Sequence, residues 1–87
     1  MSRKEVLVVE DERDIADLLA LHLKDFDCDV TVASDGHEAM RLGLARDWDL
    51  VILDLTLPGR DGLSICRALQ PVLDAPILIL TAREDDT

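Results

Sequence analysis

The sequence predicts an α/β fold in which one open sheet of parallel strands forms a single small domain. Two continuous apolar runs, residues 6–9 and 50–53, have the length and side-chain branching of strands that are buried on both faces. Segments with helical spacing of their apolar residues separate these runs from two further strands, so the elements alternate as β-α-β-α-β-α-β. The 87 residues leave room for one domain with a thin core.

A helix follows the first strand, which covers residues 6–9. Apolar residues recur at helical spacing up to about Asp25, as on the apolar face of a helix. They are Ile15, Leu18, Leu19, Leu23 and Phe26.

The next segment predicts an edge strand and a capped helix. Residues 29–33 alternate between polar and apolar side chains, which indicates a short strand at the edge of the sheet. Asp35 can cap the following helix, and Glu38, three residues later, completes a pair that resembles a capping box. This helix continues toward Arg46, and we expect Trp48 to cover an edge of the core.

The second half of the chain adds two strands and one helix. The third strand, residues 50–53, ends at Asp54, and a loop rich in proline and glycine follows. A third helical stripe extends over residues 62–69 until a proline closes it. Another proline opens the fourth strand, residues 77–80, at a position where no ladder donor is needed.

Charge and composition exclude several classes of protein. The net charge of −10 argues against direct contact of this segment with nucleic acid or an anionic membrane. No apolar run approaches the roughly 20 residues of a membrane span, and from the residues before the first strand we expect no signal peptide. Cys28 and Cys66 lack metal-ligand spacing and form no disulfide framework, so we expect reduced thiols in a cytoplasmic protein, with Cys66 in the core.

The order of the strands predicts where a ligand would bind. Connections between parallel strands are right-handed. With the first helix on one face and the next two on the other, the strand order is 2-1-3-4, by analogy with open α/β folds of this element order. The reversal then lies between the first and third strands, whose tips carry Asp11 and Asp54, and a crevice is expected there.

Three carboxylates, Glu10, Asp11 and Asp54, would crowd into that crevice. Taken alone, Asp54 is more often a turn cap, but mutual repulsion in such a cluster raises pKa values or demands a cation. Hard carboxylate oxygens suit Mg²⁺ better than zinc. A metal-held carboxylate can attack phosphorus, because the cation neutralises charge on the phosphoryl oxygens. Thr81, one strand over, could donate its hydroxyl to such an oxygen, and the small Ala82 leaves the pocket open.

Four motifs, in this order, resemble the receiver domain of bacterial two-component response regulators. They are Val-Val-Glu-Asp-Glu (8–12), Ala-Ser-Asp-Gly-His-Glu-Ala (33–39), Leu-Asp-Leu-Thr-Leu-Pro-Gly-Arg-Asp-Gly (53–62) and Leu-Thr-Ala-Arg (80–83). The resemblance covers almost the whole chain and implies a flavodoxin-like parallel sheet. The amino-acid sequences of the third and fourth motifs are most similar to those of the subfamily whose receivers precede a winged-helix DNA-binding domain. This resemblance implies transcription regulation.

The resemblance also implies a role for each matching residue. Asp54 would accept a phosphoryl group from a sensor histidine kinase, and Thr81 would be the switch hydroxyl that moves toward it. The Mg²⁺ ligands would be Asp11, Asp54, the backbone carbonyl of Thr56 and, through water, Glu10. Three positions would modulate the reaction: Thr56, Ala82 and Arg83. Such a protein is a phosphoacceptor and not an enzyme, apart from its self-catalysed phosphorylation and dephosphorylation.

The resemblance stops short at its C-terminal end. A complete receiver continues with a fourth helix, a fifth strand and a fifth helix, so we expect residues 1–87 to be an incomplete receiver domain, with its output domain outside this chain. The phosphoryl-binding lysine of the fifth strand has no counterpart in Lys4 or Lys24. The fourth strand, residues 77–80, would then present an unpaired apolar edge, and we expect a homo-oligomer to hide it.

Three other functions stay open. A receiver fragment that folds or oligomerises without signalling is the most serious of them. An aspartyl-phosphate phosphatase would need an Asp two residues after the nucleophile, where this chain has Thr56. A flavin or nucleotide binder would need a phosphate cradle rich in glycine, serine or threonine, which the turn at residues 10–12 lacks.

Overall fold

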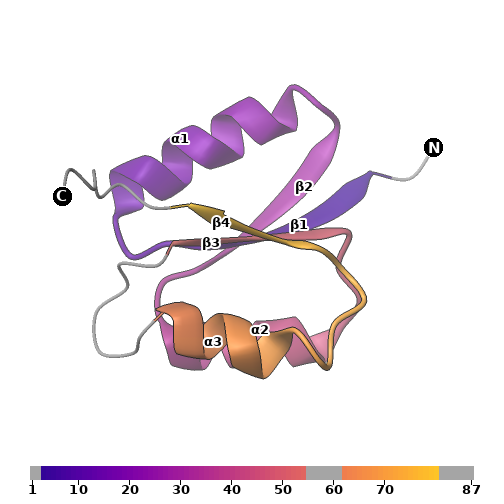
Figure 1. Cartoon of the computed structure of the whole chain (residues 1–87). Coiled ribbons are helices and arrows are strands. Elements are labelled where there is room, and N and C mark those ends of the chain that lie inside the picture. The colour runs from indigo at the N-terminus through magenta and orange to yellow at the C-terminus, as the bar shows by residue number, and fades with distance from the viewer. Residues whose placement is uncertain (1–2, 55–61, 81–87) are drawn as a thin grey trace, which may run out of the picture.

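Four parallel strands form one sheet with helices on both faces (Figure 1). The protein was analysed as a computed structural model that describes residues 3–54 and 62–80. The strands are β1 (Lys4–Val9), β2 (Cys28–Ala33), β3 (Leu50–Asp54) and β4 (Ile77–Leu80), and the helices are α1 (Arg13–Lys24), α2 (Gly36–Ala45) and α3 (Gly62–Leu69). The strand order is β2-β1-β3-β4, which confirms the predicted α/β fold and the predicted order. Helix α1 covers one face of the sheet, and α2 and α3 lie side by side on the other (Figure 1).

Each face of the sheet has its own core, because side chains alternate between the two faces of a strand. On the α2 and α3 face, the largest fully buried side chains are Leu7, Val9, Val51, Leu53, Ile65 and Leu69. On the α1 face, the buried side chains are Val6, Val8 and Ile52, with Leu19 and Leu23 of α1 packed against them. Strands β1 and β3 are therefore buried on both faces, as their continuous apolar runs predicted.

The paired length of β1 exceeds its apolar run. The strand begins at Lys4, two residues before the predicted start, because Lys4 and Glu5 still pair in register with Cys28 and Asp29 of β2. The apolar run marked only the buried part of the strand.

Only part of the predicted apolar stripe of α1 belongs to the core. Its buried face is centred on Ala16, whereas Ile15 and Leu18 are 40% and 54% exposed and Phe26 is 75% exposed in the turn after the helix. Within the described residues, α1 is the sole helix on its face, so its flanks stay open to solvent (Figure 1). Helical spacing located the helix correctly but did not show which apolar residues are covered.

The start of α2 is fixed by reciprocal hydrogen bonds. The Asp35 carboxylate accepts a hydrogen bond from the backbone N–H of Glu38 at 2.8 Å. The Glu38 carboxylate in turn accepts from the backbone N–H and the hydroxyl of Ser34, at 2.9 and 3.2 Å. The predicted pair is confirmed, although the return bond reaches one residue further back than in a capping box. These bonds tie the end of β2 to the first turn of α2.

Trp48 and Cys66 lie in the core, as predicted. Trp48 is 6% exposed, and its indole N–H donates to the Leu42 carbonyl at 3.0 Å, which anchors the connection between α2 and β3.

No helix within residues 3–54 and 62–80 is both long enough and apolar enough to cross a lipid bilayer.

The cap of α2 gives a test of this local structure. We expect Asp35→Ala to lower the free energy of unfolding by about 1 kcal/mol, because the N–H of Glu38 loses its acceptor. Urea denaturation measures this change. Glu12→Ala is the matched control, since Glu12 is the N-cap of α1 but its side chain makes no cap hydrogen bond. Equal losses in both variants would contradict the assigned role of Asp35.

Candidate acidic site

Three carboxylates meet at the carboxyl ends of β1 and β3. Val9 pairs with Leu53 in the parallel register, so Glu10 and Asp11 follow β1 at the level where Asp54 ends β3. One carboxylate oxygen from each of the three residues lies within 4.8 Å of the others. The predicted convergence at the reversal of strand order is thus confirmed.

The cluster is largely buried, and its carboxylates disturb one another. Glu10 and Asp54 are 4% and 7% exposed, while Asp11 is exposed. Burial raises the pKa of Glu10; the charges of Asp54 and Asp11 and a hydrogen bond with Asp54 raise it further. The backbone N–H of Glu12, which donates to the Glu10 carboxylate at 3.1 Å, opposes this rise in pKa.

The raised pKa of Glu10 has a definite consequence for stability. The folded protein holds the Glu10 proton more tightly than the unfolded chain does. Ionisation of Glu10 therefore lowers the stability of the metal-free fold as pH rises from the ordinary carboxylate range through the raised pKa. A cation bound at the cluster would remove this penalty.

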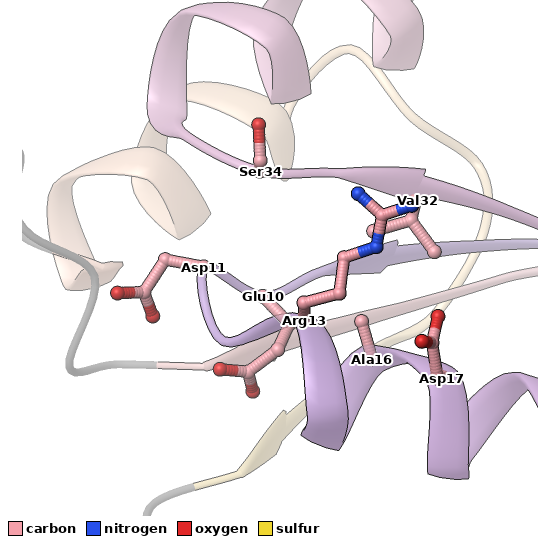
Figure 2. Close-up of a pocket in the computed structure, with 7 residues that line it drawn as sticks. All are labelled: Glu10, Asp11, Arg13, Ala16, Asp17, Val32 and Ser34. Carbon is pink, nitrogen blue, oxygen red and sulfur yellow. The ribbon is translucent and has the colours of Figure 1, made fainter.

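A pocket of about 440 Å³ opens beside the cluster, between the ends of β1 and β2 and the first turns of α1 (Figure 2). Its lining residues are Glu10, Asp11, Arg13, Ala16, Asp17, Val32 and Ser34. Figure 2 shows the Arg13 side chain extending toward Val32 and away from the carboxylates of Glu10 and Asp11. The pocket therefore leads from solvent to two residues of the cluster, Glu10 and Asp11.

Sequence reasoning did not identify Arg13, Asp17 or Ser34 as pocket residues. A signal was present, because Arg13 and Asp17 are four residues apart and share one face of the helix that follows the acidic turn. Four predicted positions lie outside the described residues, and their roles stay predictions: Thr56, Thr81, Ala82 and Arg83.

The donor set fits a hard divalent cation. Three carboxylate oxygens in one cluster, two of them on buried side chains, are ligands of the kind that Mg²⁺ and Ca²⁺ prefer. No cysteine or histidine belongs to this group of described residues, so its chemistry does not favour zinc.

Comparison with known families and structures agrees with this geometry. The family model of the response regulator receiver domain matches residues 6–87. A response regulator from Burkholderia pseudomallei, solved with a phosphorylated aspartic acid, a calcium ion and citrate, is 32% identical with a TM-score of 0.88. That match covers 94% of this chain and 49% of the other, so the present chain spans about half the length of the Burkholderia protein.

Two further structures contain the same relative. The response regulator TrrA from Thermotoga maritima, in complex with Mg²⁺-BeF, is 36% identical with a TM-score of 0.88, over 93% of this chain and 71% of the other. A complex of the histidine kinase ThkA with TrrA matches at 36% identity and a TM-score of 0.86, over 94% and 72% of the two chains. With a family match over residues 6–87 and these likenesses in fold and sequence, the chain belongs to the response regulator receiver domain family.

Proposed function

We propose that this chain is a phosphoacceptor module of a two-component signalling system, which receives a phosphoryl group on Asp54 from a sensor histidine kinase. The observation that carries the proposal is the position of Asp54 at the end of a buried strand, within 4.8 Å of the carboxylates of Glu10 and Asp11. Related structures support it: one contains a phosphorylated aspartic acid, one a Mg²⁺-BeF complex, and one a response regulator in complex with a histidine kinase.

The reaction follows from the chemistry of the cluster. A carboxylate oxygen of Asp54 attacks the phosphorus of a phosphohistidine, a new O–P bond forms, and the N–P bond breaks as the imidazole leaves. Asp11 and Asp54 would hold Mg²⁺, with the Thr56 carbonyl and, through water, Glu10. When bound, Mg²⁺ would neutralise negative charge on the transferring phosphoryl oxygens. The buried setting of Asp54 excludes much of the competing water.

The finer assignments extend this proposal along the chain. We assign residues 1–87 to one receiver unit, with Thr81 as the switch hydroxyl and Thr56, Ala82 and Arg83 as modulators of the reaction. The free thiols of Cys28 and Cys66 support a cytoplasmic location. Transcription regulation through a DNA-binding output domain rests on the sequences of residues 57–62 and 81–85, which resemble receivers that precede a winged-helix domain.

The edge of β4 supports self-association, which the sequence also predicted. Among the described residues, β4 pairs with β3 and has no second neighbouring strand. Leu78 is 50% exposed on the α1 side of the sheet, and Ile79 is 40% exposed on the other side. An apolar strand edge of this kind invites pairing with another chain, and a two-fold dimer through β4 would cover it. A dimer of this kind is also the form expected for a receiver fragment that folds and oligomerises but does not signal.

Phosphoryl transfer has a direct test. We expect acetyl phosphate with Mg²⁺ to add one phosphoryl group to the chain, seen by intact-mass analysis, and we expect Asp54→Asn to abolish the addition. Removing Mg²⁺ with a chelator should slow labelling about tenfold or more. Asp47→Asn is the control. Asp47 is an exposed aspartate before the start of β3, at the end of the strand opposite Asp54, so this variant should label as the wild type does. Labelling of Asp54→Asn at the wild-type level would refute the assignment.

Self-association through β4 can be measured by sedimentation at several concentrations. We expect the mass of the wild type to rise with concentration, and we expect Leu78→Lys to shift the chain toward monomer by placing a charge on the paired edge. Leu21→Lys is the control, because Leu21 is 62% exposed on α1. A compact monomer throughout the range, or an equal effect of both variants, would rule out a dimer built on β4.

A further inference from the structure

A groove of about 390 Å³ lies where α2 and α3 both end. It is at the amino-terminal ends of β3 and β4, whereas the three carboxylates lie at the carboxyl ends of the strands. Two exposed aliphatic side chains line it, Leu44 from the last turns of α2 and Val72 from the segment after α3, at 57% and 56% exposure. The buried ring of Trp48 also lines the groove. Covering these side chains would remove apolar surface from water, so the groove can bind an apolar side chain.

The groove is also acidic, and its acidic groups are not neutralised. Asp47 and Asp74 line it, and neither forms an ion pair or a hydrogen bond with another described residue. Helix α2 ends beside them at Ala45 without a basic residue in its last turn, so the partial negative charge of its C-terminal end adds to the acidic character of the groove.

Arg46, the one cation among the described residues that line the groove, is already engaged. Its guanidinium lies 3.3 Å from the Glu5 carboxylate and donates to the Thr31 hydroxyl at 3.1 Å. It also lies 4.5 Å from the centre of the Trp48 ring. Arg46 is therefore held by Glu5, Thr31 and Trp48. It does not pair with Asp47 or Asp74, which stay available to a partner.

We propose that this groove docks a basic, amphipathic segment of a partner protein. A large aliphatic side chain of that segment lies between Leu44 and Val72, and flanking Lys or Arg residues pair with Asp47 and Asp74. The charge of the groove selects this occupant, because Asp47 and Asp74 attract a basic segment and repel an acidic or anionic one. Since the groove and the carboxylate cluster lie at opposite ends of the strands, a partner can dock here without covering the cluster.

The test uses the intrinsic fluorescence of the full chain, whose only tryptophan is Trp48 and which has no tyrosine. A synthetic peptide of Leu and Lys residues is titrated, and a peptide with Glu in place of Lys is the matched probe. We expect the Leu/Lys peptide alone to change the Trp48 emission and to shift the backbone amide signals of Leu44 and Val72.

A pair of double variants separates docking from general charge attraction. We expect Asp47→Asn with Asp74→Asn to raise the Kd of the Leu/Lys peptide about fivefold or more, because two ion pairs are lost. Asp14→Asn with Asp25→Asn changes the net charge equally, in α1 and at its C-cap, and should raise the Kd less than about twofold.

Four results would overturn the proposal. The first three are equal effects of the two double variants, a response to the Leu/Glu peptide, and peptide-induced shifts that lie away from Leu44 and Val72. Concentration-dependent shifts of these two amides without any peptide would also overturn it, and would identify a second copy of the chain as the occupant.

Discussion

The electrostatic repulsion among Glu10, Asp11 and Asp54 is the constraint on which the functional reading of this protein depends. Two of the three carboxylates are almost completely buried, and one oxygen of each lies within 4.8 Å of the others. Burial and like charge together raise the pKa of Glu10, so the site without a cation is a source of instability. Destabilising arrangements of this kind cluster at functional sites, and under the proposed function this one holds a cation beside the carboxylate that attacks phosphorus.

The sheet holds these groups together despite their repulsion. The parallel register sets the end of β1 beside the end of β3, and the apolar cores on both faces keep those two strands in place. The backbone N–H of Glu10 donates to the Ala33 carbonyl at 2.9 Å, which fixes the acidic turn to the end of β2. Just beyond Ala33, the bonds among Ser34, Asp35 and Glu38 fix the start of α2. Rigid packing below the site therefore opposes the separation that repulsion alone would favour.

Much of this architecture could be predicted from the sequence, for reasons that differ between residues. The continuous apolar runs of β1 and β3 specified buried central strands, and the position of Asp11 and Asp54 at their ends specified the site. The exposure of Ile15 and Leu18 could not be predicted, because helical spacing does not tell whether a neighbouring element covers the flank of α1. The contacts of Arg46 with Trp48, Glu5 and Thr31 also could not be predicted, since they join two strands to the connection between α2 and β3.

The free energy of unfolding of wild type and Glu10→Gln, measured in urea from the ordinary carboxylate range up to neutral pH with and without Mg²⁺, tests the central claim most directly. Without Mg²⁺, the wild type should lose stability as pH rises, whereas Glu10→Gln should be more stable at neutral pH and less dependent on pH, because it lacks the buried charge. Mg²⁺ at about ten times its Kd should stabilise the wild type by about 1.4 kcal/mol, and the variant less. Glu12→Gln is the control, because Glu12 is an exposed carboxylate two residues away, and this variant should behave as the wild type does. Identical pH dependence and identical Mg²⁺ effects in wild type and Glu10→Gln would contradict the account.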